Sequence, residues 1–369
     1  MPTPDARFTR LLGYLDADPE NLALLADAAD AAVAEGETAM AADLVDRYAA
    51  VAPLTPPLLN LLAVCALAEG RWADAAAILE SVRADRPEDA VLRLNLARAR
   101  EGLCDYEGVL TLLEDAPPPA DATPLKLRAL HHLGRLDEAL ALGRGMDPQI
   151  DDPALWGALA SIAMDAEALD LAALWASRAP LTADGLAAQG LLALTEGETP
   201  KARLLLEDGL SRHPGSARLQ LGLASVLLSE GDAAAAAERF DSAANIFGDH
   251  LGSWTAAGWA WLIAGDRARA QARFETVVAL DDSFGEGHGG LAVIALQDGR
   301  PEDARRRAEI ALRLDPESLG GLLTRALLLE QAGESALADR LRQGALKAPI
   351  GPGGHSILQM AAKLAVNLR

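Results

Sequence analysis

Apolar residues recur along the chain at the spacing of amphipathic helices. One example is the segment that begins at Leu251. Four of its apolar residues fall at i, i+3, i+4 and i+7 and therefore share one face of a helix. These positions are Trp254, Ala257, Gly258 and Trp261. The next segment repeats the spacing with Ala270, Phe274 and Val277. The pattern predicts pairs of amphipathic helices.

Glycines divide these helical segments at a fixed interval of 34 residues. The regular series is Gly197, Gly231, Gly265, Gly299 and Gly333, and the same interval separates Gly36 from Gly70. Gly102 and Gly134 follow at steps of 32, and Glu167 stands where the next glycine is due. Prolines keep the interval too, at Pro19, Pro53 and Pro87. Since glycine readily ends a helix with a positive φ and proline cannot continue one, each unit is predicted to be a helical hairpin.

A period of 34 residues with these side chains resembles the tetratricopeptide repeat. That family has a large apolar residue at repeat position 4, small residues at 8 and 20, large ones at 11 and 24, and proline at 32. The unit at Leu251 departs only at position 32, where Asp282 replaces proline. Its matching residues are Trp254, Gly258, Trp261, Ala270 and Phe274. The resemblance implies an all-α fold, a right-handed superhelical solenoid of antiparallel helix pairs.

The repeats are expected to occupy residues 21–350, in about ten hairpins, as the 34-residue period implies. They are degenerate near 103–181, where Leu103 and Cys104 are interpreted as an insertion. Residues 1–20 are predicted to form an N-terminal capping helix. Residues 351–369 are predicted to form a C-terminal one, with Ser356 as its N-cap. End elements of this kind shield the apolar faces of terminal repeats in solenoids.

Composition and charge narrow the classes of partner. The chain is 50% hydrophobic but only 4% aromatic, and its net charge is −21. Such an acidic chain repels nucleic acid and anionic lipid, so neither is expected as a partner. Residues 1–123 hold 22 acidic and 9 basic residues, which suggests that a basic partner segment binds there. We find no signal-like or membrane-spanning run and expect a soluble cytoplasmic protein, or a periplasmic one if a signal was removed.

Candidate chemistry is sparse. The segment 285–290 satisfies G-x-G-x-x-G, but a predicted helix precedes it, whereas dinucleotide binding needs a strand there. The 6 histidines show no H-E-x-x-H spacing, and Cys65 and Cys104 show no metal-binding companions. The run Arg305 to Arg307 is interpreted as a solvated face, with a contact to an acidic partner as the alternative. We therefore predict no catalytic residue, metal or cofactor, and no enzymatic activity.

The positions that face the concave groove in such repeats are mostly apolar from residue 186 onward. The candidate partner-binding residues are Leu191, Leu194, Leu221, Leu228, Trp259, Leu262, Val293, Leu296, Leu323 and Leu327. One interpretation is that they only pack against neighbouring helices. The other is an exposed trough for an amphipathic helix or apolar segment. The family's carboxylate clamp of lysine, arginine and asparagine is missing, since Asn60 and Asn95 look isolated.

The resemblance favours a non-catalytic scaffold that binds a partner protein or peptide in this groove. Two alternatives stay open. The chain could self-assemble into a structural homo-oligomer, or it could be an adaptor or chaperone-like subunit of a bacterial secretion or envelope complex. The bacterial assignment rests on the composition, which is rich in alanine, arginine, aspartate and glycine and poor in lysine.

Overall fold

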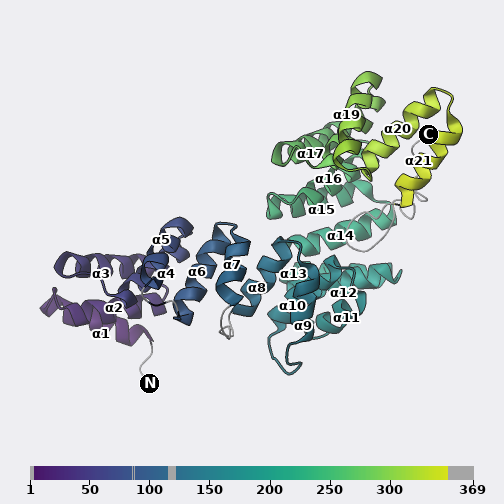
Figure 1. The fold of residues 1–369 in the computed structure, drawn as a ribbon. Coiled ribbons are helices and arrows are strands. Elements are labelled where there is room, and N and C mark those ends of the chain that lie inside the picture. The colour runs from purple at the N-terminus through teal and green to yellow at the C-terminus, as the bar shows by residue number, and fades with distance from the viewer. Residues whose placement is uncertain (1–3, 85, 87, 115–121, 348–369) are drawn as a thin grey trace. The chain divides into compact units, whose positions relative to one another are not determined.

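A computed structural model describes residues 4–84, 86, 88–114 and 122–347 (Figure 1). This part of the chain contains helices α1 to α21 and no strand. The helices follow one another as hairpins, and the predicted all-α solenoid fold is confirmed. No helix among these residues is long and apolar enough to cross a lipid bilayer. The chain divides into two compact units, Met1–Ala139 and Leu140–Arg369.

The first unit holds α1 to α8 and the start of α9. The helices are α1 (Pro4–Ala17), α2 (Leu22–Ala34), α3 (Thr38–Val51), α4 (Pro56–Ala68), α5 (Trp72–Arg83), α6 (Ala90–Gly102), α7 (Tyr106–Glu114), α8 (Ala122–His132) and α9 (Leu136–Arg144). Helix α1 packs on α2 and buries Phe8 and Leu15.

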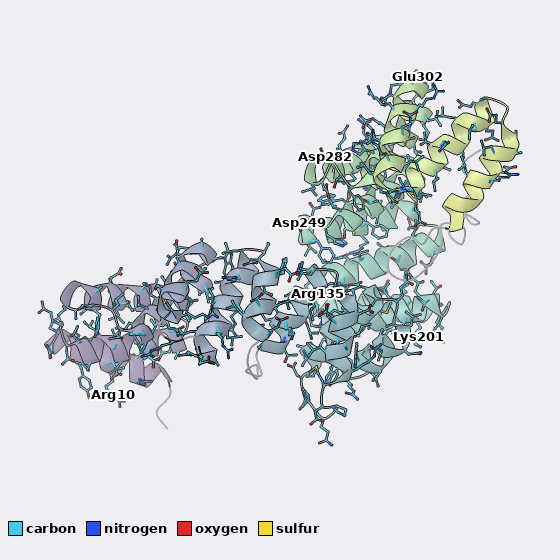
Figure 2. The ribbon with its side chains drawn as sticks, viewed as in Figure 1. Arg10, Arg135, Lys201, Asp249, Asp282 and Glu302 are labelled. Carbon is cyan, nitrogen blue, oxygen red and sulfur yellow. The ribbon has the colours of Figure 1, made fainter. Side chains whose placement is uncertain are left out.

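The second unit continues the hairpins. Its helices are α10 (Pro153–Asp165), α11 (Leu169–Ala176), α12 (Ala183–Thr195), α13 (Thr199–Arg212), α14 (Ala217–Glu230), α15 (Ala233–Phe247), α16 (Leu251–Ile263), α17 (Arg267–Leu280), α18 (Gly285–Gln297), α19 (Pro301–Leu314), α20 (Leu319–Gln331) and α21 (Ser335–Lys347). Asp249 and Asp282 mark the turns that lead into α16 and α18 (Figure 2). The capping helix predicted at 351–369, with Ser356, lies outside the described residues.

The turn inside each hairpin is fixed by a residue in the left-handed region. Every glycine of the regular 34-residue series has a φ between +70° and +91°. Cys104 and Glu167 adopt the same conformation, with φ of 59° and 55°. Glu167 was expected at this position. Cys104 was not, and the insertion predicted at Leu103 and Cys104 is wrong, because Cys104 itself is the turn residue, 34 positions after Gly70.

Gly102 has a different role from the one its spacing predicted. It is the last residue of α6, and a Cβ atom there would lie 2.3 Å from the indole of Trp72. A side chain at this site would displace the tryptophan, so glycine at position 102 allows Trp72, the first residue of α5, to pack on α6.

The core of the second unit runs through successive hairpins. Large side chains alternate with alanine, which lets the helices approach closely. The continuous cluster includes Leu206, Leu219, Phe240, Trp261, Phe274 and Ile294, with Ala202, Ala236, Ala257 and Ala270 between them. The first helices contribute many residues to this cluster, and some of their other apolar side chains are only partly buried.

Candidate binding face

The ten candidate groove residues come from the first helices of five successive hairpins, α12, α14, α16, α18 and α20. We call these ten residues the first-helix face. Leu194 and Val293 are buried, with exposed fractions of 8% and 3%, and so belong to the core. The other eight are partly buried, and none is exposed. The face therefore consists of apolar side chains that the chain itself covers only in part.

Trp259 makes contacts within the chain that its position in the sequence did not indicate. Its Nε1 donates a hydrogen bond to Oε1 of Glu286 at 3.0 Å. Its ring meets Phe274 edge-on, with the ring centroids 5.4 Å apart, which is a favourable arrangement for two aromatic rings. The indole is partly buried and packs against the core cluster. Only part of Trp259 is thus available to a partner.

Glu286 is the functional candidate that sequence reasoning missed. Its Oε2 accepts a hydrogen bond from Ser318 Oγ at 2.6 Å, and its Oε1 lies 3.3 Å from the backbone N of Gly320. Ser318 is the N-cap of α20, so a carboxylate on α18 meets the electropositive end of α20. With Trp259 on α16, this one side chain joins three successive first helices.

The electrostatics of Glu286 are unusual for a carboxylate. Removal from water raises its pKa to about 7, and the negative charge of Asp315 acts in the same direction. The hydrogen bonds from Ser318, Gly320 and Trp259 lower the pKa but do not offset the loss of water. Glu286 therefore changes its charge near neutral pH.

The glycines around Glu286 explain the G-x-G-x-x-G pattern. They open α18 directly after α17, so the segment has a helix and not a strand before it. A Cβ atom on Gly320 would lie 2.2 Å from the carbonyl carbon of Gly289, and one on Gly290 would lie 2.4 Å from the Phe274 ring. These glycines allow close packing of α18 against α20 and α17. The same close approach brings Glu286 to the end of α20.

Asn60 and Asn95 are not isolated, contrary to the expectation from sequence. Asn95 Nδ2 donates to Asn60 Oδ1 at 3.0 Å, and Arg98 Nη1 lies 3.4 Å from Asn95 Oδ1. The pair links the first helices α4 and α6. Their spacing of 35 residues is one more than the repeat, which is why a simple comparison of repeat positions did not pair them.

The arginine run and the two cysteines show no sign of a ligand site. Arg305 pairs with Glu302, and Arg306 and Arg307 pair with Asp303, all on the first turns of α19. Cys65 is fully buried, and burial raises the pKa of its thiol, whereas Cys104 is exposed. Within the described ranges no three histidine, cysteine or acidic residues are placed to hold a metal ion.

Comparison with known proteins supports the repeat assignment. Two family models described as tetratricopeptide repeat match the chain, one at residues 66–131 and 193–256 and the other at 26–90, 255–318 and 291–345. A search of curated proteins finds no match.

Several solved structures are similar to this chain. A monomeric mutant of IFIT1 with Gppp-AAAA is 14% identical, covers 93% of this chain and 94% of its own, and has a TM-score of 0.54. The APC/C hetero-tetramer Cut9–Hcn1 is 15% identical, with coverage of 92% and 83% and a TM-score of 0.49. The pilF protein of Pseudomonas aeruginosa is 17% identical, with coverage of 51% and 88% and a TM-score of 0.43. At these identities the likeness concerns the fold alone.

Proposed function

Because the chain belongs to the tetratricopeptide-repeat family, we propose that it is a non-catalytic scaffold that holds an apolar or amphipathic segment of a partner protein on the first-helix face. The observation that carries this proposal is the partial burial of eight of the ten apolar side chains on α12 to α20. A row of half-covered leucines is a surface that a partner can dehydrate further, with a gain of about 25 cal/mol per Å² of apolar area.

The chemistry of the face favours an apolar partner over a charged one. Helix α16 has no charged residue between Leu251 and Ile263, and α18 has Glu286 as its one carboxylate. An amphipathic helix that presents apolar residues at i, i+3, i+4 and i+7 matches such a surface. Trp259 would be a central contact, because tryptophan contributes strongly at protein interfaces.

A nucleic-acid ligand fits this chain poorly. The IFIT1 structure contains Gppp-AAAA, but the present chain has a net charge of −21 and would repel a phosphate backbone. We therefore propose only a protein-binding role for the present chain.

The proposal is tested with a defined probe, an 18-residue end-blocked peptide with leucine on one helical face and glutamine and serine on the other. Leu262→Asn and Leu323→Asn each replace a partly buried leucine of the face, and we expect each to weaken peptide binding about tenfold, the loss that goes with about 1.4 kcal/mol. Fluorescence anisotropy of a labelled peptide measures the affinity.

Leu204→Asn is the matched control, since Leu204 lies on the second helix α13 and is 68% exposed. Its affinity should equal that of the unmodified chain. Equal losses in all three variants, or no loss in any, would contradict the proposal. Sedimentation over a range of concentrations tests the alternative occupant, because a face filled by a second copy would give concentration-dependent dimers.

A further inference from the structure

Glu286 lies where the proposed binding face and the packing between repeats meet. From α18 it accepts the indole N–H of Trp259 on α16 and the Ser318 hydroxyl and Gly320 backbone N–H at the start of α20. Its side chain is partly buried, and Trp259 is itself a member of the first-helix face. Because Trp259 contacts Glu286 directly, a segment that binds on Trp259 comes close to this carboxylate.

No described lysine, arginine or histidine forms an ion pair with Glu286. Helix α16 contributes no charged group. On α18, His288 directs Nε2 to the backbone oxygen of Asp282, 3.1 Å away. Ahead of α20 stands Asp315, which acts on Glu286 by charge repulsion, and on α20 Arg325 and Glu330 are exposed. The carboxylate is thus held by neutral donors.

We propose that occupation of the face around Trp259 is linked to uptake of a proton at Glu286, so that this face binds its partner more tightly at mildly acidic than at mildly alkaline pH. The inference rests on the proposed function.

Two physical effects act in this direction. A partner that covers Trp259 removes the remaining water near Glu286, and loss of water favours the neutral carboxyl over the carboxylate. Protonation also weakens the bond from Trp259, because a hydrogen bond to a charged acceptor is roughly twice as strong as one to a neutral acceptor. The indole then moves more easily to meet a partner.

The neutral form can keep the local packing. A protonated Oε2 can donate to Ser318 Oγ, which also accepts from the backbone N of Gly321 at 3.2 Å. Oε1 remains an acceptor for Trp259 and Gly320. Glutamine offers the same kinds of group, an acceptor oxygen and a donor, so Glu286→Gln mimics the protonated state, in which the Ser318 hydroxyl accepts from residue 286 instead of donating to it.

The size of the effect follows from the pKa of Glu286, which is about 7 in the free protein. If the group is neutral in the complex, the dissociation constant rises about tenfold between pH 6 and pH 8. The leucine, glutamine and serine peptide described above has no titratable group, so this change belongs to the protein.

The experiment measures peptide affinity at pH 6 and pH 8 for three proteins. The unmodified chain should show the tenfold change, and Glu286→Gln should bind equally well at both pH values. Glu317→Gln is the matched control, because Glu317 is exposed and precedes Ser318 directly. It should keep the full tenfold change.

Binding without pH dependence, or the same dependence in Glu286→Gln, overturns this inference and leaves the proposed function intact. A peptide that binds at neither pH overturns the proposed function instead. The free protein supplies a separate readout, namely the Trp259 fluorescence obtained as the difference from Trp259→Phe. It should titrate with a midpoint near pH 7 and cease to do so in Glu286→Gln, and a flat profile in the unmodified chain overturns the inference without any peptide.

Discussion

At the scale of single residues, side-chain length and local packing decide what Glu286 does. Gly287 permits α18 to approach α17, Gly289 and Gly320 permit α18 to approach α20, and the glutamate then reaches the N-terminus of α20. The contact satisfies two donors at a helix start but leaves a carboxylate with little water around it. This balance makes Glu286 a site where pH and stability are coupled.

Glu286→Gln is expected to stabilise the second unit at pH 8. The pKa of Glu286 is raised from 4.5 in the unfolded chain to about 7 in the fold, so folding is penalised once the group ionises. The penalty is absent below pH 4.5, grows as pH rises toward 7 and is then constant. Glutamine should raise the free energy of unfolding by up to about 3 kcal/mol at pH 8. Urea unfolding at pH 5 and pH 8 measures this, and a benefit that is larger at pH 5 would contradict it.

At the scale of elements, the hairpin depends on a left-handed residue after the first helix and on a capped start to the helices. Side-chain N-caps that accept a backbone N–H occur at many of these starts, and they satisfy donors that a helix leaves unpaired. These N-caps are Asn21, Asp89, Asp152, Thr182, Ser216, Asp232, His250, Asp266 and Ser318. Two turns, at Cys104 and Glu167, have a Cβ-bearing residue in the left-handed conformation.

Glu167→Gly is expected to stabilise the hairpin of α10 and α11. A non-glycine residue in the left-handed region costs roughly 1 kcal/mol, and glycine removes this strain at a smaller cost in chain entropy. The net gain should be about 0.5 kcal/mol or more in the free energy of unfolding. Gly265→Ala is the reverse control and should destabilise by about 1 kcal/mol, since Gly265 has a φ of +85°. Thermal unfolding of both variants checks the signs, and a loss of stability in Glu167→Gly would refute the explanation.

At the scale of the whole molecule, the chain divides into two compact units, and each described hairpin contacts mainly its neighbours. Stability in such an array is close to a sum of repeat and interface contributions, so parts of it can open independently. The proposed binding face lies within the second unit, and its stability should therefore respond to changes in that unit.

Phe274→Ala is expected to lower protection from hydrogen exchange across α16 to α19 and to leave α2 to α5 unchanged. Phe274 is fully buried, and its loss should cost about 3 to 5 kcal/mol. Leu44→Ala, in the core of the first unit, should lower protection across α2 to α5 and leave α16 to α19 unchanged. Exchange measured by mass spectrometry on both variants tests the two units, and a uniform loss of protection in either variant would show one cooperative body.

Local sequence features are enough to predict the architecture. The 34-residue period of Gly197 to Gly333 and the apolar spacing around Trp254 and Trp261 are local features, and local helix formation with turn chemistry is enough to specify a hairpin and its repetition. The same features placed Glu167 at a turn, as the structure shows.

Contacts between side chains of different hairpins become visible only in the folded chain. Sequence spacing placed Trp259 on the binding face but could not show that Glu286, 27 residues later, accepts its N–H. Sequence spacing also gave no sign of the hydrogen bond between Asn95 and Asn60. It led to the prediction of an insertion at Cys104, which is in fact the turn residue. The physical reason is that such contacts depend on the distance between packed helices, which is set by whether a Cβ atom fits at positions such as Gly289 and Gly320, and a one-dimensional period contains no such distance.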